Sequence, residues 1–354
     1  MKLLIVGCGT IATSYVRDIK AHAGLEIVGF TDVDHQRAES FAREHGGTAY
    51  PDLTAALADP AVEMVVNLTI FEAHYTVVKQ ALEAGKHVYS EKPLALKYSE
   101  AEELVRLAQA RGLRLACAPI TFLGEAQQTA LKQVRSGELG TVRLVYAEVN
   151  QGRIESWHPN PGPFYAVGPN LDVGVYPLSI TTAVLGRVAR LSAYARTLYP
   201  QRVTKEGIPF TITAPDYYVI NLEFESGPVM RLTTNFYVSK ETKGGKVIEF
   251  HGDKGSLALE SWFESGVRVE QSEFGKPYHA VPLLRPASSA LDWARGVQDF
   301  SQAIESGRPA RVTGEHAAHV VEILDATNRS VADGGQPVTL HSDFPLPDPM
   351  DWAR

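Results

Sequence analysis

The 354-residue sequence has few cysteines, no block of one charge and no long apolar run. Its two cysteines, Cys8 and Cys117, cannot form a disulfide framework, which favours a reducing compartment. The 34 basic and 41 acidic residues give a net charge of −7 without a Lys/Arg run, so nucleic acid and anionic membranes are not expected partners. The apolar start Leu3–Val6 stops at Gly7 and is too short for a secretory signal. We therefore expect a cytoplasmic protein without a membrane span.

The sequence also lacks a cluster of His, Cys, Asp or Glu with metal-ligand spacing, so we predict no metal site. It shows neither an internal repeat nor a low-complexity linker. Its length suggests about two domains, each large enough to have its own core.

The first 120 residues alternate between short apolar runs and segments with helical spacing. The runs predict strands at Leu3–Val6, Ile27–Thr31, Met64–Leu68, His87–Ser90 and Arg114–Ala118. The segments between them predict helices at Ala12–Ala23, His35–His45, Ala73–Ala84 and Ser99–Arg111. This pattern is typical of βαβ units and predicts a doubly wound α/β domain with a parallel sheet, which we assign to residues 1–120.

After about residue 140 the periodicity changes to alternating, β-branched and aromatic segments. They predict strands at Val142–Asn150, Tyr217–Glu225, Val229–Tyr237, Lys246–His251 and Ser256–Glu260. FESGP at 224–228 predicts a tight turn, and helices are expected near 173–185, 289–305 and 314–332. Residues 121–354 are therefore expected to form an α+β domain on a mainly antiparallel sheet.

The stretch GCGTIA follows the first predicted strand and fits the G-x-G-x-x-A pattern of dinucleotide-binding turns. Gly7 permits a tight turn, Gly9 lets the backbone approach a pyrophosphate, and Ala12 keeps the next helix close to the strand. The first helical turn supplies further cofactor contacts, expected from Thr10 and Ile11.

Asp32 ends the second predicted strand, 25 residues after Gly7. A carboxylate there accepts hydrogen bonds from both ribose hydroxyls of NAD and repels the extra phosphate of NADP. We therefore predict NAD as the cofactor, although the nearby Arg37 leaves NADP open. The alternative is a glycine turn of another α/β protein in which Asp32 only caps the next helix.

A charged pair, Glu91 and Lys92, follows the predicted strand His87–Ser90 and precedes Pro93. Ligands of open parallel sheets bind beyond the carboxyl ends of the strands. We therefore expect Lys92 to point toward the nicotinamide end of the cofactor and to place its ammonium near a reacting oxygen.

The combination of GCGTIA, SEKPLAL and NLDVGVY resembles the Gfo/Idh/MocA family, and HGDKGSLAL and SVADGGQPVTL extend this resemblance over nearly the whole chain. The resemblance implies a Rossmann domain, a second domain with a large open sheet, and an active site between them. It implies that Lys92 contacts both the substrate and the nicotinamide ribose. It also implies a homodimer or homotetramer formed through the C-terminal sheet.

The family pattern D-x-G-x-H reads here as Asp172, Gly174 and Tyr176, which resembles the branch in which a tyrosine is the acid/base. The four-residue spacing of Asp172 and Tyr176 predicts one shared helical face, and Pro177 requires the helix to begin nearby. Lys92 and the helix dipole would both favour the phenolate. Asp172 would orient the substrate or keep Lys92 charged. The alternative is that Tyr176 is a packed core residue.

Four further positions are weaker candidates, Thr69 and His74 for cofactor contacts and Trp157 and His158 for substrate contacts. In the family stretch T-P-N-x-x-H, Thr69 and His74 match, whereas Ile70 and Phe71 depart from the pattern. The loop SWHPNPGPFY carries two candidate substrate contacts, Trp157 and His158.

We predict from these features an NAD(P)-dependent oxidoreductase that acts on a sugar, cyclitol or related polyol. Two alternatives remain at this point: a glycoside hydrolase that uses NAD transiently, and a non-catalytic sensor of dinucleotide or sugar. Retention of both Lys92 and Tyr176 argues against the sensor, because a sensor needs no proton-transfer pair.

Overall fold

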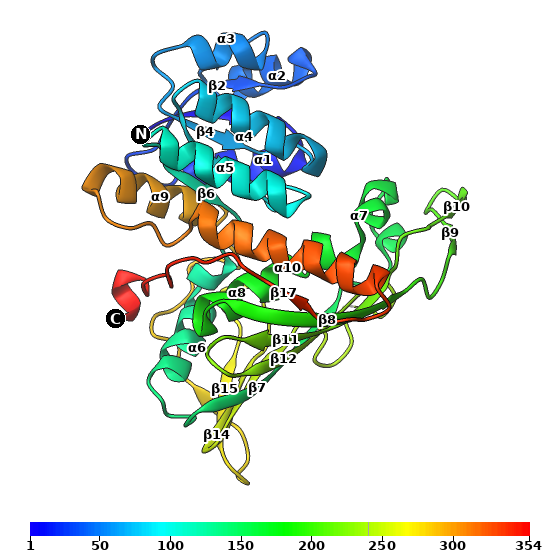
Figure 1. Ribbon diagram of the computed structural model, residues 1–354. Helices are drawn as coiled ribbons and strands as arrows, with labels where there is room; N and C mark the ends of the chain where they lie inside the picture. The colour runs from blue at the N-terminus through cyan, green and yellow to red at the C-terminus, as the bar shows by residue number, and fades with distance from the viewer. Residues whose placement is uncertain (240) are drawn as a thin grey trace. The chain divides into compact units, whose positions relative to one another are not determined.

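The computed structural model describes residues 1–239 and 241–354, which divide into two compact units (Figure 1). Unit 1 contains Met1–Ile120 and Asp292–Val321, and unit 2 contains Thr121–Leu291 and Glu322–Arg354. The units differ from the division at 1–120 and 121–354 in one respect, because residues 292–321 cluster with the first unit. That division into folding domains stays a prediction.

Unit 1 is built on six parallel strands in the order β3-β2-β1-β4-β5-β6 (Figure 1). The order steps outward on both sides of β1 and β4, as in doubly wound dinucleotide-binding folds. The strands are β1 Lys2–Val6, β2 Glu26–Thr31, β3 Thr48–Ala49, β4 Met64–Asn67, β5 His87–Ser90 and β6 Leu115–Cys117. All five expected strands are present, so the predicted parallel sheet is confirmed.

The helices of unit 1 follow the strands closely. They are α1 Thr10–Ile19, α2 His35–His45, α3 Leu53–Ala58, the short η1 Phe71–Ala73, α4 His74–Glu83, α5 Tyr98–Ala110 and α9 Arg295–Ser306. The long helix α10 Gly314–Ala332 begins in unit 1 and ends in unit 2. The short elements β3 and α3 were not expected, since two and six residues are too few to show a period.

The core of unit 1 lies between the sheet and its helices. Leu4, Val65 and Val88 of the strands are fully buried against Val78 of α4 and Leu104 of α5. Each such side chain contributes roughly 1.5–3 kcal/mol when it leaves water. This packing fixes the strands whose ends carry the candidate site.

Unit 2 is built on nine strands in the order β16-β15-β14-β13-β7-β12-β11-β8-β17 (Figure 1). Neighbours are antiparallel except β7 and β12, which are parallel, so the predicted large, mainly antiparallel sheet is confirmed. The strands are β7 Val142–Asn150, β8 Val188–Arg196, β11 Tyr217–Phe224, β12 Val229–Asn235, β13 Ile248–Gly252, β14 Gly255–Leu259, β15 Val269–Glu273, β16 His279–Val281 and β17 Val338–Thr339.

The remaining elements of unit 2 are η2 Thr121–Leu123, α6 Glu125–Arg135, η3 Ile154–Ser156, α7 Gly162–Asp172, α8 Val175–Leu185, η4 Asp351–Ala353 and the hairpin β9 Gln201–Val203 with β10 Pro209–Thr211. Figure 1 shows this hairpin projecting from the nine-stranded sheet. Helix α6 packs on β14 and β15, and α7 packs on β11 and β12. The predicted turn at 224–228 is confirmed, because the Phe224 N–H donates to the Pro228 carbonyl at 2.9 Å.

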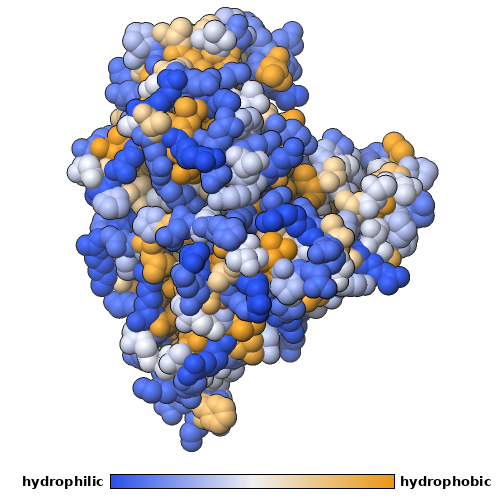
Figure 2. Space-filling model, in the orientation of Figure 1, coloured by the Kyte–Doolittle hydropathy of each residue, from blue (hydrophilic) through white to orange (hydrophobic). Residues whose placement is uncertain are grey.

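Among the described residues, no helix combines the length and the apolar character needed to cross a bilayer. On the face shown in Figure 2, apolar residues occur in small groups among polar ones.

Candidate functional site

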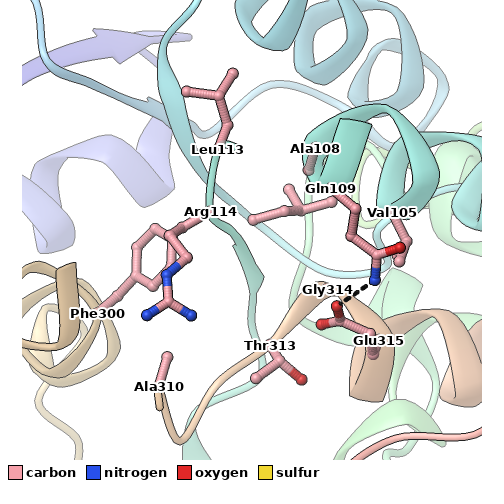
Figure 3. A pocket seen from close by; sticks show the side chains of 11 residues that line it. Val105, Ala108, Gln109, Leu113, Arg114, Phe300, Ala310, Thr313, Gly314 and Glu315 are labelled. Carbon is pink, nitrogen blue, oxygen red and sulfur yellow. Dashed lines mark hydrogen bonds between the residues drawn. The ribbon is translucent and has the colours of Figure 1, made fainter. Parts of the chain in front are cut away.

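A small cavity in unit 1 lies between α5, the start of β6, α9 and α10 (Figure 3). Its volume is about 60 Å³, room for a few water molecules but not for a nucleotide. The Arg114 guanidinium lines it, and Gln109 Nε2 donates a hydrogen bond to Glu315 Oε1 at 2.9 Å along one wall. Leu113 and Leu115 place this cavity at the amino end of β6, whereas ligands of such sheets bind at the carboxyl ends.

The carboxyl ends of β1, β2, β4 and β5 are in register. Val6 pairs with both Thr31 and Asn67, and Asn67 pairs with Ser90. The residues that follow these strands therefore meet along one edge, and they include Gly7, Asp32, Thr69, Glu91 and Lys92.

The two glycines of the first loop have different roles. Gly7 has a φ of +93°, and a Cβ there would lie 2.8 Å from the Leu68 carbonyl carbon and oxygen. A Cβ on Gly9 would meet no protein atom within 4 Å. Gly9 is also the N-cap of α1, so open space borders the amide end of this helix. This space and the positive end of the helix dipole suit the pyrophosphate of a dinucleotide.

The Asp32 carboxylate stabilises the glycine loop and does not cap helix α2. Its Oδ2 accepts a hydrogen bond from the Cys8 N–H at 2.7 Å, and its Oδ1 accepts one from the Asp34 N–H at 2.8 Å. The N-cap of α2 is Asp34, whose carboxylate accepts from the Gln36 N–H, so the capping alternative for Asp32 is wrong. Arg37 is engaged in an ion pair of 3.2 Å with Asp34.

Cys8 lies inside the glycine loop. Burial, followed by the charge of Asp32, raises the pKa of the Cys8 thiol to about 12. The thiol therefore stays protonated near neutral pH, which makes it a poor nucleophile and agrees with a packing role.

Glu91 and Lys92 are both buried at the end of β5. Glu91 Oε1 accepts a hydrogen bond from the Tyr15 hydroxyl of α1 at 2.5 Å, and Glu91 Oε2 accepts one from the Lys92 N–H at 3.1 Å. The Lys92 ammonium lies 5.4 Å from the centre of the Phe71 ring, which is close enough for a cation–π interaction. The peptide bond between Lys92 and Pro93 is cis.

Thr69 and His74 connect the end of β4 to this lysine loop. The His74 ring is fully buried, with Nδ1 2.6 Å from the Pro93 carbonyl oxygen and Nε2 3.0 Å from the Thr69 carbonyl oxygen. Burial lowers the pKa of His74, so the ring is neutral near pH 7 and donates to one of the two carbonyls. The Thr69 hydroxyl donates to Asn67 Oδ1 at 2.7 Å. His74 and Thr69 thus stabilise the loop and present few free polar atoms.

In unit 2, Asp172 and Tyr176 do not share one continuous helix, which corrects the expectation from their spacing. Asp172 is the last residue of α7, and Tyr176 is the second residue of α8. The helix breaks because Pro177 has no N–H to donate to the carbonyl of residue 173, so α8 can begin only where Pro177 falls in its first turn. The expectation that Tyr176 lies at a helix N-terminus is confirmed.

The Tyr176 ring is 9% exposed and packs on two aromatic side chains. It stacks on Trp262 with centroids 5.2 Å apart and planes at 22°, and it meets the edge of Phe263 at 5.3 Å. Asp172 is also buried. Packing therefore fixes the phenol ring at the start of α8, and its role in proton transfer stays a prediction.

Trp157 and His158 lie in the loop after β7 and pack on Phe164. The ring centroids of Trp157 and His158 are 5.5 Å apart, and those of His158 and Phe164 are 4.8 Å apart. The Asn160 N–H donates to His158 Nδ1 at 3.0 Å, which leaves the proton of a neutral ring on Nε2. Trp157 is 40% exposed, so this loop presents an aromatic wall.

A buried ion network that the sequence did not reveal supports this loop. Arg202 of β9 is fully buried and pairs with Glu155 at 2.8 Å and with Asp216 at 2.5 Å. Its Nη1 also donates to the Tyr165 hydroxyl at 2.6 Å, and Tyr165 donates to Glu155.

Two other residues that contact the candidate site were not predicted from the sequence, Tyr15 beside Glu91 and Trp262 beside Tyr176. Apolar periodicity includes both, so their sequence pattern is that of ordinary core residues.

No group of three or more His, Cys, Asp or Glu side chains within residues 1–239 and 241–354 is arranged to hold a metal ion.

Comparison with known proteins agrees with this geometry. A family model described as an oxidoreductase family with an NAD-binding Rossmann fold matches residues 1–118, and a GFO/IDH/MocA C-terminal domain matches residues 127–258. The chain belongs to the Gfo/Idh/MocA oxidoreductase family. The protein is therefore an NAD(P)-dependent oxidoreductase, and the nicotinamide dinucleotide expected from the glycine loop is confirmed as its cofactor.

Among its relatives is a dTDP-3,4-didehydro-2,6-dideoxy-alpha-D-glucose 3-reductase of Streptomyces antibioticus, 34% identical over 93% of this chain and 95% of the relative. A D-glucoside 3-dehydrogenase of Escherichia coli is 26% identical over 96% of this chain and 97% of the relative. The crystal structure of an NAD binding oxidoreductase from Klebsiella pneumoniae aligns with a TM-score of 0.86 at 20% identity, covering 97% of this chain and 100% of that one. At that identity the structural match supports the fold alone.

Proposed function

We propose that this member of the family is an NAD-dependent dehydrogenase or reductase of a sugar, cyclitol or related polyol. The observation that carries the proposal is the buried Lys92 at the carboxyl end of β5, on the same edge as the glycine loop and Asp32. The similarity to two enzymes named for glucose derivatives supports the substrate class.

In this proposal, Lys92 and Tyr176 have separate roles in the reaction. A bound nicotinamide supplies the hydride acceptor or donor. Lys92 donates a hydrogen bond to the oxygen on the reacting carbon and stabilises negative charge there. Tyr176 removes the hydroxyl proton during oxidation and returns it during reduction. Its position in the first turn of α8 favours the phenolate through the helix dipole, and Asp172 orients the substrate.

Asp32 sets the preference for NAD in this proposal. Its carboxylate is fixed by the N–H groups of Cys8 and Asp34, beside the first glycine loop. A carboxylate in this position accepts from ribose hydroxyls and repels a 2′-phosphate.

A panel of sugars and polyols tested with NAD and NADP, followed at the nicotinamide absorbance, identifies the reaction. We expect Lys92→Met and Tyr176→Phe each to lower turnover by ~10²-fold or more, while NAD affinity is largely kept. The matched controls are the exposed Lys97→Met and Tyr278→Phe, which should behave like the wild type. Full activity in Lys92→Met would refute the mechanism. Product release without accumulation of NADH would indicate the hydrolase instead.

We also propose that the chain forms a homodimer or homotetramer through the sheet of unit 2. The strands of this sheet carry exposed apolar side chains, among them Tyr194 at 54% exposure and Val229 at 41%. Sedimentation of Tyr194→Lys against the wild type tests the interface, and an unchanged mass in the variant would place the contact elsewhere.

A further inference from the structure

Four strands of unit 2 end at the same edge of the sheet. β7 and β12 are parallel, and β8 and β14 run in the same direction because each is separated from them by one antiparallel strand. Two or three residues beyond these strand ends come Arg153, Tyr237, Tyr199 and Trp262, respectively after β7, β12, β8 and β14. The edge that carries the packing partner of Tyr176 therefore also carries an arginine and two tyrosines.

These three side chains form a single contact. The Arg153 guanidinium carbon lies 4.9 Å from the centre of the Tyr199 ring and 4.8 Å from that of the Tyr237 ring. The two rings meet edge to face, with centroids 6.3 Å apart, so the guanidinium lies over the corner that they form. We call Arg153, Tyr199 and Tyr237 the arginine corner.

The arginine corner is anchored in the buried ion network. The Arg202 guanidinium lies 5.5 Å from the centre of the Tyr199 ring and 4.4 Å from that of Tyr165. Arg202 is itself held by Glu155 and Asp216. The corner is thus preorganised, which lowers the entropic cost of binding a ligand there.

Among the described residues, the charge of Arg153 is not matched by an acid. Across residues 1–239 and 241–354, no carboxylate lies within ion-pairing distance of Arg153, although the side chain is exposed. Three arginines on the strands of the same sheet are paired, Arg143 with Asp253, Arg190 with Glu223 and Arg231 with Glu148. A planar guanidinium held in this way is suited to bind a phosphate or carboxylate through two parallel hydrogen bonds.

The place of the corner limits what it can bind. β14 and β7 are two strands apart, and β14 and β12 are three apart. The Trp262 indole nevertheless reaches β7, where its Nε1 donates to the Glu148 carbonyl at 3.0 Å. Arg153 follows Glu148 by five residues and lies beyond the end of β7, so an anion at the corner would lie outside the part of the strand beside which Trp262 and Tyr176 stack.

We propose that the arginine corner binds an anionic group that the substrate carries away from its reacting carbon, so that the substrate is a phosphorylated or carboxylated sugar. This inference rests on the proposed function. Phosphate has two sources, a simple sugar phosphate and the diphosphate of a nucleotide sugar, and the panel of compounds below distinguishes them. The exposed aromatic wall of Trp157, on the same loop as Arg153, would cover the substrate between the two ends.

The test compares glucose, glucose 6-phosphate, glucuronate and UDP-glucose with NAD⁺ in the wild type, Arg153→Met and Arg196→Met. Arg196 is a matched control, because it is an exposed arginine at the end of β8 that, within residues 1–239 and 241–354, stacks on no ring and has no acid partner. We expect the wild type to prefer an anionic compound. Arg153→Met should raise KM for that compound by about 10- to 100-fold at unchanged kcat, the scale of one charged hydrogen-bonded contact. Arg196→Met should match the wild type.

The comparison of compounds shows which anionic group the arginine corner binds. A preference for UDP-glucose indicates a nucleotide sugar, one for glucose 6-phosphate a simple phosphate, and one for glucuronate a carboxylate. Equal losses for glucose and its anionic counterparts in Arg153→Met would mean that the arginine corner only stabilises the surface, and would overturn the inference.

A calorimetric measurement keeps the inference separate from the proposed function. If no compound is turned over, the proposed function fails for this panel, but binding of UDP, glucose 6-phosphate and glucuronate still tests the corner. Binding of one of them by the wild type, weakened about 10-fold or more in Arg153→Met alone, supports the anion site. Equal binding by both proteins, or binding by neither, refutes it.

Discussion

Removing the Arg202 side chain should destabilise unit 2 strongly. Arg202 and Asp216 are fully buried and Glu155 is 8% exposed on its side chain, so Arg202→Met leaves two carboxylates without their cation in a poorly solvated site. Loss of one partner of a buried pair costs about 3–5 kcal/mol. For a unit of about 200 residues, 1 kcal/mol lowers Tm by roughly 2–4 °C, so we expect a decrease of roughly 6–20 °C.

The control is Arg190→Met. Arg190 forms a two-pronged pair with Glu223 on β8 and β11, but both side chains are about half exposed, at 50% and 49%. Such a pair contributes only about 0–1 kcal/mol. Thermal and urea unfolding by circular dichroism, with NAD added to stabilise unit 1, compares the two variants. A loss in Arg202→Met no larger than that in Arg190→Met would refute the reasoning. Arg202→Met with Asp216→Asn should recover part of the loss, because one stranded charge is removed.

Three further predictions concern unit 1. Gly7→Ala should lower its stability by about 1–3 kcal/mol, because the new Cβ meets the Leu68 backbone at a φ of +93°, whereas Gly9→Ala should keep Tm and weaken NAD binding as measured by fluorescence titration. The hydrogen bond to Asp292 raises the pKa of His22, so the pair stabilises the folded protein below about pH 6.5, and this contribution is lost as pH rises through the raised pKa. The Tm of His22→Gln should therefore differ from that of the wild type more near pH 5.5 than near pH 8.5. Asp32→Ser should raise the ratio of kcat/KM for NADP to that for NAD by about 10-fold or more, and an unchanged ratio in initial-rate assays would mean that the carboxylate does not contact the ribose.

The sequence by itself determined the features that depend on neighbouring residues. Strand and helix periods located the five main strands of unit 1 and the strand Val142–Asn150, since burial on one or both faces selects apolar residues at fixed intervals. Gly7 predicted a tight turn, because few residues other than glycine adopt a backbone conformation with a φ of +93°. Pro177 located the start of α8, because proline lacks the donor that a helix interior requires.

Sequence patterns predicted the structure least well where polar side chains are buried. Helix α6 carries Glu125, Gln127 and Gln128, which a periodicity argument assigns to a solvent-facing surface, yet all three are buried. Arg285 pairs with Glu125 at 2.7 Å, and Gln127 donates to the Ser261 carbonyl at 3.1 Å. Arg285 and Ser261 lie 160 and 134 residues away from the residues that they compensate, so no short window of sequence contains both partners.

Only the tertiary structure decided which distant residues meet. Segment 292–321 returns to unit 1, and Arg202 finds Glu155 at a separation of 47 residues. The arginine corner joins loops after β7, β8 and β12, and these strands are neighbours only through the order β7-β12-β11-β8. Strand order is set by the summed burial of whole sheet faces and by the closure of long loops, which no local run of residues encodes.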